Sequence, residues 1–344
     1  MIRAAIAGGS GYRAGELARL LLNHPDVDLL WISSTSHASQ PVADVHQGLL
    51  GQTDIVLSPQ PTTLVGNDTT LPVPDILFLA GNDGQGARFL RDVPVPDDLK
   101  IVDLTSDHRQ GSFIAHHGPT DFIYGLSELS RKIIVREGSR VAVPGALAHA
   151  VLLALLPLAK NLVLTPKSKV NATVVTGSTA TGINPSAANH FSWLNNNITA
   201  YQPFTHPDLP EIRSALATAQ SVDFNQLTDE DAISLVPLRA PVTRGVYAAV
   251  WFDTDLSEGE VRRMFEDAYD DHRFTFLSPR PVDIKDVAGT NKCLIHIEKQ
   301  GCKMMISTVI DYLLKGSAGT AVHAMNLLFG LEETTGLTLH PTAY

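Results

Sequence analysis

Short apolar runs separated by helical or loop segments dominate the first half of the chain. Residues 4–7 form a small apolar run, and residues 16–22 have the spacing of an amphipathic helix. Three further apolar runs, at residues 29–32, 76–80 and 101–104, each lead into polar or glycine-rich residues. Buried strands separated in this way are typical of a parallel, doubly wound α/β sheet. We therefore predict a Rossmann-type domain in this half.

The pattern changes after Pro144-Gly145, where longer segments alternate between apolar and polar positions. Such alternation predicts a mixed sheet with helices on one face, an α+β arrangement. The predicted elements are a helix at residues 146–159, strands at 169–175, 233–238 and 246–252, a helix at 257–271 capped by Ser257, and a hairpin of strands at 292–297 and 303–307.

Two domains account for this change of pattern. We expect one domain to comprise residues 1–145 together with 316–344, because residues 319–331 are again helical and return to it. Residues 146–315 would form the other domain. A length of 344 residues agrees with two domains.

Composition narrows the class of partner. With 44% apolar and 18% charged residues the chain can build a sizeable core, which excludes wholesale disorder. Lys plus Arg is 26 against 36 Asp plus Glu, a formal charge of −10. Because nucleic-acid binding needs clustered cations, this balance argues against nucleic acid as a partner. A small cationic pocket for an anionic ligand remains compatible with it.

The sequence also predicts a cytoplasmic protein with no membrane partner. The longest apolar run, at residues 146–159, is interrupted by His149 and Pro157 and is too short to span a bilayer. The first residues lack the layout of a signal peptide. Two cysteines, Cys293 and Cys302, cannot make a disulfide framework.

A glycine-rich turn is the first candidate site. Gly9-x-Gly11-x-x-Ala14 follows a predicted strand and opens a predicted helix, which is the context of a dinucleotide-binding fingerprint. The glycines allow a tight turn and a close approach to a pyrophosphate, which the start of the helix attracts. The alternative is an ordinary strand-to-helix turn.

The cofactor is predicted to be NADP (NADPH) rather than NAD. An NAD site usually places an Asp or Glu about 20 residues after the turn. Here the second strand ends in Ser33-Ser34-Thr35-Ser36, whose hydroxyls can donate to a phosphate that a carboxylate would repel. Arg13 could add a cation to this site, or be an ordinary exposed helix arginine.

Several further segments resemble the NADP-dependent N-acetyl-γ-glutamyl-phosphate reductases of arginine biosynthesis, relatives of the aspartate-semialdehyde dehydrogenases. The resemblance runs from end to end and implies a semialdehyde dehydrogenase-like fold, an acidic small-molecule substrate and a homo-oligomer, either a dimer or a tetramer. The segments around His190 and Asn195-Asn196-Asn197 resemble the branch that uses an N-succinylated substrate. The segments that carry the resemblance include Gly8-Gly9-Ser10-Gly11-Tyr12, Asp44-Val45-His46-Gln47-Gly48, Asp107-His108-Arg109, Pro144-Gly145, Gly177-Ser178-Thr179, Pro210-Glu211-Ile212, Arg244-Gly245 and Leu314-Lys315-Gly316.

The chemistry of that family depends on a cysteine that this chain lacks at the matching position. In the family, a thiolate at the start of a helix attacks the acyl phosphate, and NADPH then reduces the thioester. The family's Asn-Pro-Gly-Cys stretch reads Val143-Pro144-Gly145-Ala146 here. Cys293 and Cys302 sit near the predicted hairpin, and Cys293 is expected to be a packed core thiol.

Other departures fall near the same site. The family's His-x-His-x-Pro-Glu-Ile stretch keeps His206 and has Asp208 in place of its second histidine, and Tyr312 replaces an asparagine near the nicotinamide. The resemblance assigns the position of Ala146 and His206 to catalysis. It assigns Gly8, Gly9, Ser10, Gly11, Tyr12, Arg13, Ser34, Thr35, Ser36 and Tyr312 to the cofactor, and Arg109, Ser178, Glu211 and Arg244 to the substrate.

Two of these assignments have alternatives. Arg109 and Arg244 are the best candidates for clamps on a substrate anion, but could instead form salt bridges. His149, His206 and Asp208 could make a small proton-transfer or metal set, yet their spacing does not favour a metal. We therefore predict no metal, and expect His149 to be a buried histidine.

Three functions remain open at the level of the sequence. We favour an inactivated or repurposed reductase scaffold that still binds NADP, because a methyl group cannot form a thioester. The first alternative is a working reductase of N-acetyl- or N-succinyl-γ-glutamyl phosphate that transfers hydride directly. The second is a non-catalytic cofactor-binding or interaction subunit.

Overall fold

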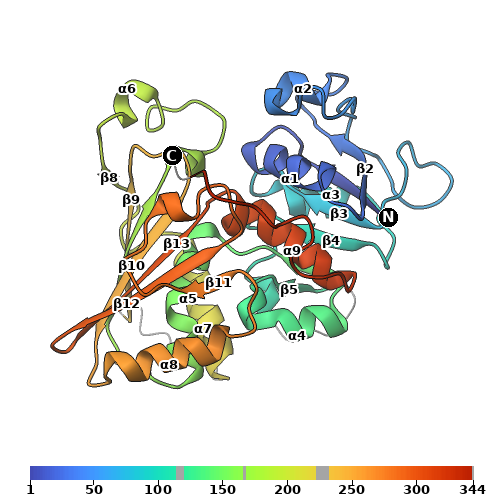
Figure 1. Ribbon diagram of the computed structural model, residues 1–344. Coiled ribbons are helices and arrows are strands. Elements are labelled where there is room, and N and C mark those ends of the chain that lie inside the picture. Colours follow the sequence, from blue (N-terminus) through green and yellow to red (C-terminus); the bar gives the residue numbers. More distant parts are fainter. Residues whose placement is uncertain (114–119, 166–167, 222–231, 343–344) are drawn as a thin grey trace. The chain divides into compact units, whose positions relative to one another are not determined.

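The computed structural model describes residues 1–113, 120–165, 168–221 and 232–342. The chain divides into two units, coloured along the sequence in Figure 1. One comprises Met1–Pro144 and Ser317–Thr338, and the other comprises Gly145–Gly316 and Leu339–Tyr344.

These bounds differ from the expected ones by one residue at each join, and at the end of the chain. The chain from Leu339 onward belongs to the second unit rather than the first. The Thr342 N–H donates to the Ala288 carbonyl at 3.2 Å, a contact between segments far apart in the sequence.

The first unit contains a six-stranded sheet in the order β2-β1-β3-β4-β6-β5, and every neighbouring pair is parallel. Its apolar runs are buried on both faces, as a parallel sheet requires. The doubly wound sheet predicted for this half is confirmed. The strands are β1 Ile2–Ala7, β2 Val27–Ser33, β3 Ile76–Leu79, β4 Lys100–Asp103, β5 Phe122–Tyr124 and β6 Arg140–Ala142.

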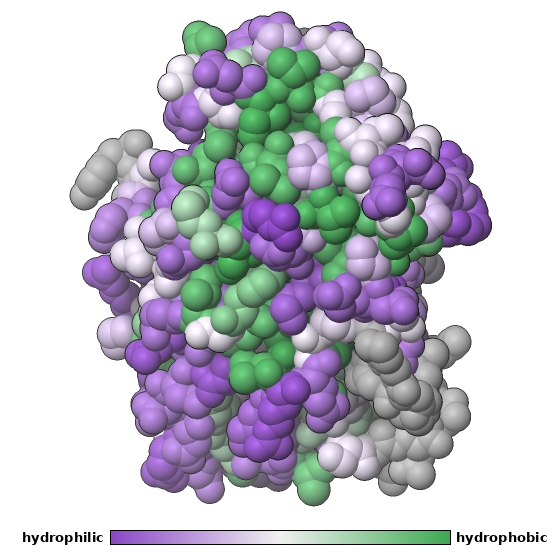
Figure 2. Space-filling view, turned by 90° about the vertical axis from the view of Figure 1, so that its right-hand side faces the viewer, coloured by the Kyte–Doolittle hydropathy of each residue, from purple (hydrophilic) through white to green (hydrophobic). Residues whose placement is uncertain are grey.

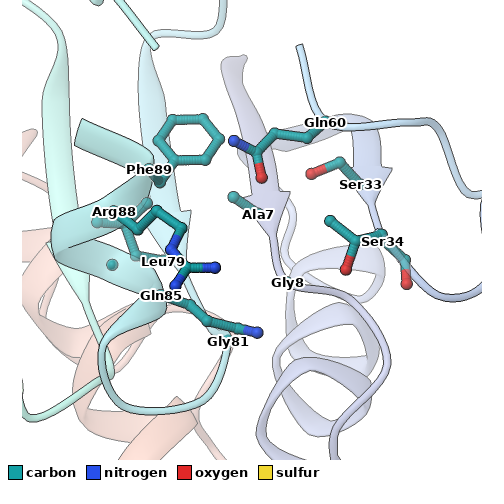
Figure 3. A pocket seen from close by; sticks show the side chains of 12 residues that line it. Ala7, Gly8, Ser33, Ser34, Gln60, Leu79, Gly81, Gln85, Arg88 and Phe89 are labelled. Carbon is teal, nitrogen blue, oxygen red and sulfur yellow. The ribbon is translucent and has the colours of Figure 1, made fainter. Parts of the chain in front are cut away.

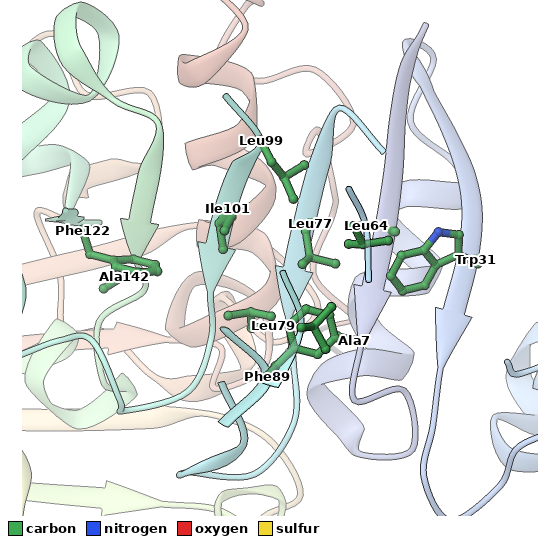
Figure 4. Packing of buried hydrophobic residues seen from close by; sticks show 12 residues of the cluster. Ala7, Trp31, Leu64, Leu77, Leu79, Phe89, Leu99, Ile101, Phe122 and Ala142 are labelled. Atoms are coloured by element: carbon green, nitrogen blue, oxygen red, sulfur yellow. The ribbon is translucent and has the colours of Figure 1, made fainter. Parts of the chain in front are cut away.

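An apolar cluster fills one side of this sheet (Figure 4). Trp31, Leu77, Leu79 and Phe89 are buried in it, and they come from β2, β3 and a helix that follows β3. The indole N–H of Trp31 donates to the Pro72 carbonyl at 2.9 Å, which satisfies its polar group. The cluster fixes the strand ends beside the glycine-rich turn.

Five helices described in this unit accompany the sheet. The first of them, α1, starts directly after the glycine-rich turn and buries Leu17, Leu20 and Leu21. The last helix returns from the far end of the chain, as predicted, and its Asn326 side chain pairs with His24 at 3.0 Å. The helices are α1 Tyr12–Leu22, α2 Val42–Val45, α3 Gln85–Asp92, α4 Ser127–Glu137 and α9 Gly319–Leu328.

The order of the strands reverses at β1. The chain passes from β1 to β2 on one side and then crosses to β3 on the other. In open α/β sheets ligands bind beyond the carboxyl ends of the strands at such a point. The topology therefore predicts a ligand site at the loops that follow β1, β2 and β3.

The second unit contains a seven-stranded mixed sheet in the order β11-β12-β13-β10-β7-β9-β8. Its β11/β12 and β7/β9 pairs are parallel and the others antiparallel, so the predicted mixed sheet is confirmed. The strands are β7 Val170–Thr176, β8 Thr199–Ala200, β9 Ile233–Arg239, β10 Val246–Asp253, β11 Thr275–Leu277, β12 Cys293–Gln300 and β13 Lys303–Ile310.

Helices cover one face of this sheet. Strands β7 and β9 alternate between buried and half-buried residues, and α5 packs against β10 and β13. The hydroxyl of Thr308 donates to the Ala150 carbonyl at 2.8 Å, and that of Tyr269 donates to the Leu153 carbonyl at 2.7 Å. The helices described in this unit, of which α6 has no buried residue, are α5 Ala146–Lys160, α6 Phe191–Leu194, α7 Asp208–Gln220 and α8 Glu258–Tyr269.

The predicted cap of α8 is confirmed in detail. The Ser257 hydroxyl accepts from the Glu260 N–H, and the Glu260 carboxylate accepts from the Ser257 N–H. This reciprocal capping box satisfies two backbone donors at the start of the helix.

In Figure 2, green apolar areas lie between purple hydrophilic ones, as expected for a folded protein with few charged residues. No helix among the described residues combines the length and apolar character that crossing a bilayer requires.

Candidate functional site

The turn between β1 and α1 uses glycine where a side chain would collide. Gly8 has φ +91°, and a Cβ there would lie 2.5 Å from the Gly81 backbone. A Cβ on Gly9 would lie 2.3 Å from the Ile32 side chain, whereas one on Gly11 would meet no heavy atom within 4 Å. Gly11 therefore leaves open space at the start of α1, where backbone N–H groups of a helix can attract an anion.

A histidine holds this turn from outside. The Nε2 of His46 donates to the Gly9 carbonyl at 2.7 Å. A Cβ on Gly15 would lie 2.6 Å from the His46 ring, so a glycine is required there for the ring to fit. The sequence signalled His46 only as part of a family segment, and its positioning role was missed.

A pocket of about 110 Å³ opens beside the turn, at the carboxyl ends of β1, β2 and β3 (Figure 3). It lies at the point where the strand order reverses, which is where a ligand is expected. One wall comes from the end of β2 and another from α3. The lining residues are Ala7, Gly8, Ser33, Ser34, Thr35, Gln60, Leu79, Gly81, Gln85, Gly86, Arg88 and Phe89.

The hydroxyl run after β2 reaches this pocket in part. Ser34 and Thr35 line it, whereas Ser36 is not among the lining residues. The Ser36 hydroxyl pairs with the His37 ring at 2.7 Å, and the Ser34 hydroxyl accepts from the His37 N–H at 3.2 Å. The pocket wall at β2 is therefore hydroxyl-rich and carries no carboxylate.

Arg13 is committed elsewhere. Its Nη1 donates to the Leu104 carbonyl at 2.5 Å, and its Nη2 lies 3.9 Å from the Asp83 carboxylate. These partners come from the loops after β4 and β3, and neither Arg13 nor either of them lines the pocket. The expectation that Arg13 adds a cation beside the hydroxyl run does not fit this geometry.

The cation in the pocket is Arg88, which the sequence reasoning missed. It lies on α3 and reaches into the space that faces Ser33 and Ser34 (Figure 3). Within the described residues, no hydrogen bond or ion pair of its guanidinium is found. Its signal in the sequence was weak, because one arginine on a short helix is ordinary.

In the second unit, Ala146 is the first residue of α5 and is 7% exposed. A Cβ built on Gly316 would lie 2.9 Å from the Ala146 methyl group, so the two backbones approach closely. The resemblance assigns this position to a nucleophile, and a methyl group offers none.

Two buried carboxylates occupy N–H groups at the start of α5. Glu211 Oε1 accepts from the Gly145 N–H at 2.8 Å, and Asp208 Oδ2 accepts from the Ala148 N–H at 3.2 Å. Asp208 is 8% exposed and Glu211 2%. Acidic groups are stabilised by the positive end of a helix, which accounts for their burial here. Glu211, which the resemblance assigns to the substrate, caps the start of α5 in the structure.

His206 lies beside Asp208 and is also buried. Its Nδ1 accepts from the Asp208 N–H at 3.2 Å and lies 3.8 Å from the Asp208 carboxylate. Burial lowers the pKa of His206, although the charge of Asp208 opposes this. Its ring meets the Tyr201 ring edge-on at 5.8 Å. The structure therefore joins His206 to the start of α5 through Asp208.

The two candidate arginine clamps are engaged within their own units. Arg109, in the first unit, donates from Nε to the Val143 carbonyl at 2.9 Å. Arg244 makes two hydrogen bonds, of 2.9 and 2.8 Å, to the fully buried carboxylate of Asp311. The salt-bridge alternative therefore describes Arg244 better than the clamp does.

Two other predicted residues lie close together. Ser178 follows β7, and its N–H donates to the Val242 carbonyl at 2.8 Å. The Tyr312 hydroxyl reaches the Ala180 carbonyl at 3.5 Å. Tyr312 therefore contacts the Ser178 segment within the second unit.

The two cysteines and His149 do not form a functional site among the described residues. Cys293 is buried on β12, as the prediction of a packed thiol requires, and Cys302 is exposed beside Asp253 at 3.7 Å. His149 is fully buried on α5. Across the described ranges, no group of three or more His, Cys, Asp or Glu side chains is arranged to hold a metal.

Comparison with known proteins places the chain. A model for the NAD binding domain of semialdehyde dehydrogenases matches residues 3–136, and one for their dimerisation domain matches residues 147–312. Proteins named N-acetyl-γ-glutamyl-phosphate reductase from Parabacteroides distasonis and Phocaeicola vulgatus are each 44% identical and aligned over 100% of both chains. The chain belongs to the N-acetyl-γ-glutamyl-phosphate reductase family.

Solved structures of the wider group share the fold. Aspartate semialdehyde dehydrogenase II from Vibrio cholerae, complexed with ASA, has a TM-score of 0.69 at 15% identity and covers 96% of this chain and 98% of its own. The Candida albicans enzyme, solved with NADP, has a TM-score of 0.66 at 14% identity, with coverages of 96% and 99%. The predicted semialdehyde dehydrogenase-like fold is confirmed.

Proposed function

We propose that the protein binds NADP(H) and acts on N-acetyl-γ-glutamyl phosphate. The observation that carries this proposal is the 44% identity, along the whole chain, to proteins named for that reductase activity. It favours a working reductase over the inactivated scaffold that the sequence alone favoured.

Residues of the first unit suit the cofactor. The open space at Gly11 admits a pyrophosphate at the start of α1. We assign the 2′-phosphate to the pocket wall formed by Ser34 and Thr35, with Arg88 as the cation. Gly8, Gly9, Ser10 and Tyr12 complete the turn. When bound, NADPH supplies the hydride.

Ala146 sets the character of the reaction. No thioester can form at residue 146, and neither Cys293 on β12 nor Cys302 at its hairpin offers a thiol at the start of α5. The substrate must therefore be positioned without a covalent bond. Covalent positioning of a well-oriented group is worth roughly 7–11 kcal/mol, so we expect turnover to be slow.

A second candidate function is ligand binding without turnover. It is favoured by Ala146 together with the carboxylates of Asp208 and Glu211, which already occupy N–H groups at the start of α5. Under this candidate the protein retains its cofactor and substrate sites and serves as a non-catalytic subunit.

We also propose that the protein self-associates through its second unit. The match to a dimerisation domain covers residues 147–312, and large aromatic side chains are exposed around α6. Phe191 is 77% exposed and Trp193 62%. Exposed aromatic residues of this size are typical of interfaces. Light scattering should give a multiple of the chain mass, and a Phe191→Ser/Trp193→Ser variant should lower it.

One experiment separates the two candidate functions. NADPH binding is measured by fluorescence titration, and then NADPH oxidation is followed with N-acetyl-γ-glutamyl phosphate. Saturable binding with slow, protein-dependent oxidation supports the reductase, and Ala146→Cys should raise its rate. If the wild type and Ala146→Cys both bind NADPH but neither oxidises it, the result supports the non-catalytic candidate. Absence of NADPH binding would reject both.

A further inference from the structure

Arg239 ends β9 on the face of the sheet that the helices cover. Along β9 the buried residues Ile233 and Leu235 alternate with half-buried ones, and Arg239, itself half-buried, falls on the same face as the buried residues because it lies an even number of positions from them. It stands opposite Thr176, the last residue of β7. Both residues therefore lie at the carboxyl ends of two parallel strands.

The guanidinium of Arg239 is held by an aromatic ring. Its Cζ lies 4.8 Å from the centroid of the Tyr201 ring. The Tyr201 hydroxyl is anchored in turn to the Thr176 hydroxyl at 3.1 Å. The Nε of Arg239 is enclosed and has no hydrogen-bond partner among the described residues, and no ion pair to it is found there. In Arg244, by contrast, the guanidinium is paired with Asp311.

A chain of contacts links Arg239 to the start of α5. The Tyr201 ring meets the His206 ring at 5.8 Å, and His206 contacts Asp208, the first residue of α7. Asp208 accepts from the Ala148 N–H. Arg239 thus lies at the end of the unit where α5 and α7 both begin, with two aromatic rings between it and the Asp208 carboxylate.

We propose that Arg239 binds a carboxylate of the substrate. The inference rests on the proposed function, whose substrate class carries a carboxylate next to its acylated nitrogen. A guanidinium matches a carboxylate with two parallel hydrogen bonds, and the Tyr201 face excludes water from one side of it. Asp208 and Glu211 are held by backbone N–H groups, which leaves the charge of Arg239 for a ligand.

Binding of three probes to the wild type and to Arg239→Met, measured by calorimetry, tests the proposal. The probes are N-acetyl-L-glutamate, its α-amide and N-succinyl-L-glutamate. Because a charge-assisted pair is lost, the affinity for N-acetyl-L-glutamate should fall by about 10- to 100-fold in Arg239→Met. The α-amide should bind both proteins equally.

The probes also distinguish two sources of the carboxylate. If Arg239 binds the α-carboxylate, both acids should weaken by the same factor. If it binds the terminal carboxylate of a succinyl group, N-succinyl-L-glutamate alone should weaken. Either pattern supports the proposal, and the second also assigns the succinyl branch.

Other outcomes overturn it. If the wild type and Arg239→Met bind every probe equally, Arg239 does not contact the substrate, and the proposed function is unaffected. If Arg239→Met weakens binding of the α-amide as much as binding of N-acetyl-L-glutamate, Arg239 would instead lie at the reacting end of the substrate. If no probe binds the wild type while NADPH does, the proposed substrate class fails, and the inference fails with it.

Two further variants guard against a structural effect. Arg263→Met removes an exposed arginine of α8 in the same unit and should leave all three affinities unchanged. Arg239→Lys keeps the charge and should retain part of the preference for acid over amide. If Arg239→Met is unfolded by circular dichroism, the lysine variant carries the test.

Discussion

Replacing Arg88 by methionine removes a guanidinium from the pocket wall that faces Ser33 and Ser34. If this cation pairs with the 2′-phosphate, NADPH affinity should fall by about 10- to 100-fold, the value of one charge-assisted pair. Affinity for NADH, which lacks that phosphate, should change little. Fluorescence titrations with both nucleotides measure the difference.

A neighbouring arginine provides the control. Arg91 lies on the same helix, is exposed, pairs with Asp92 at 2.9 Å and does not line the pocket. Arg91→Met should leave both affinities as in the wild type. Equal losses of NADPH and NADH affinity in Arg88→Met would show that Arg88 supports the pocket without reading the phosphate.

His206 gives the protein a predictable response to acid. Burial lowers its pKa in the folded state, whereas the unfolded chain takes up the proton near pH 6.5. The unfolded state therefore binds more protons, and stability falls as the pH drops below about 6.5. The melting temperature should drop less between pH 7.5 and 5.5 in His206→Gln than in the wild type.

The exposed His340 offers a matched comparison for this test. His340→Gln should show the same drop as the wild type. An unchanged drop in His206→Gln would mean that other groups carry the acid sensitivity.

The arginines show where sequence reasoning stops at this scale. Arg13 was placed correctly at the start of α1, yet its guanidinium ends on Leu104, 91 positions away. The partner of Arg244, Asp311, is 67 positions away. A long side chain reaches whichever partner the fold brings near, and one sequence does not reveal that partner.

Among the elements, α5 is the one whose start decides the chemistry. A cysteine at the first residue of a helix normally has a low pKa, because the helix N-terminus stabilises the thiolate. Here the carboxylates of Asp208 and Glu211 already neutralise that end. In Ala146→Cys, made in a Cys302→Ser background, we expect a thiol pKa at or above about 8.5. The pH dependence of alkylation by iodoacetamide measures it.

Removing one carboxylate should reverse this effect. Adding Asp208→Asn is expected to lower that thiol pKa by about one unit or more, because a like charge is lost beside the thiolate. Asp267→Asn, an exposed change on α8, should not move it. A low thiol pKa in Ala146→Cys alone would contradict the view that the carboxylates neutralise the helix end.

Elements with strong local patterns were predictable from the sequence. The alternation in β12 and β13, the apolar length of α5 and the Ser257 cap of α8 are all written in neighbouring residues. The closing of the α5 start by Asp208, 60 positions later, was not predictable. Short strands such as β5, with three residues, also carry too little pattern.

At the scale of the whole molecule, each unit has its own sheet and its own candidate ligand. At a concentration about 100 times its Kd, NADPH should raise the free energy of unfolding of the first unit by about 2.7 kcal/mol. Hydrogen exchange should then slow most at the turn before α1 and along α3. N-acetyl-L-glutamate should instead slow exchange around residues 199–211. Protection of residues 199–211 by NADPH as strong as that by N-acetyl-L-glutamate would contradict the assignment of the two ligands to these segments.

The buried carboxylate of Asp311 has a consequence for how inactive variants are interpreted. It accepts from Arg244 and from the N–H groups of Gly289, Leu313 and Leu314, so it ties together three stretches of chain. Asp311 is fully buried but the Arg244 side chain is 26% exposed, so deleting Arg244 should cost about 1–3 kcal/mol, against a total stability of roughly 5–15 kcal/mol. An Arg244→Ala protein should therefore become scarce in cells through proteolysis. A screen that scores growth would record a lost activity where the loss is one of protein abundance.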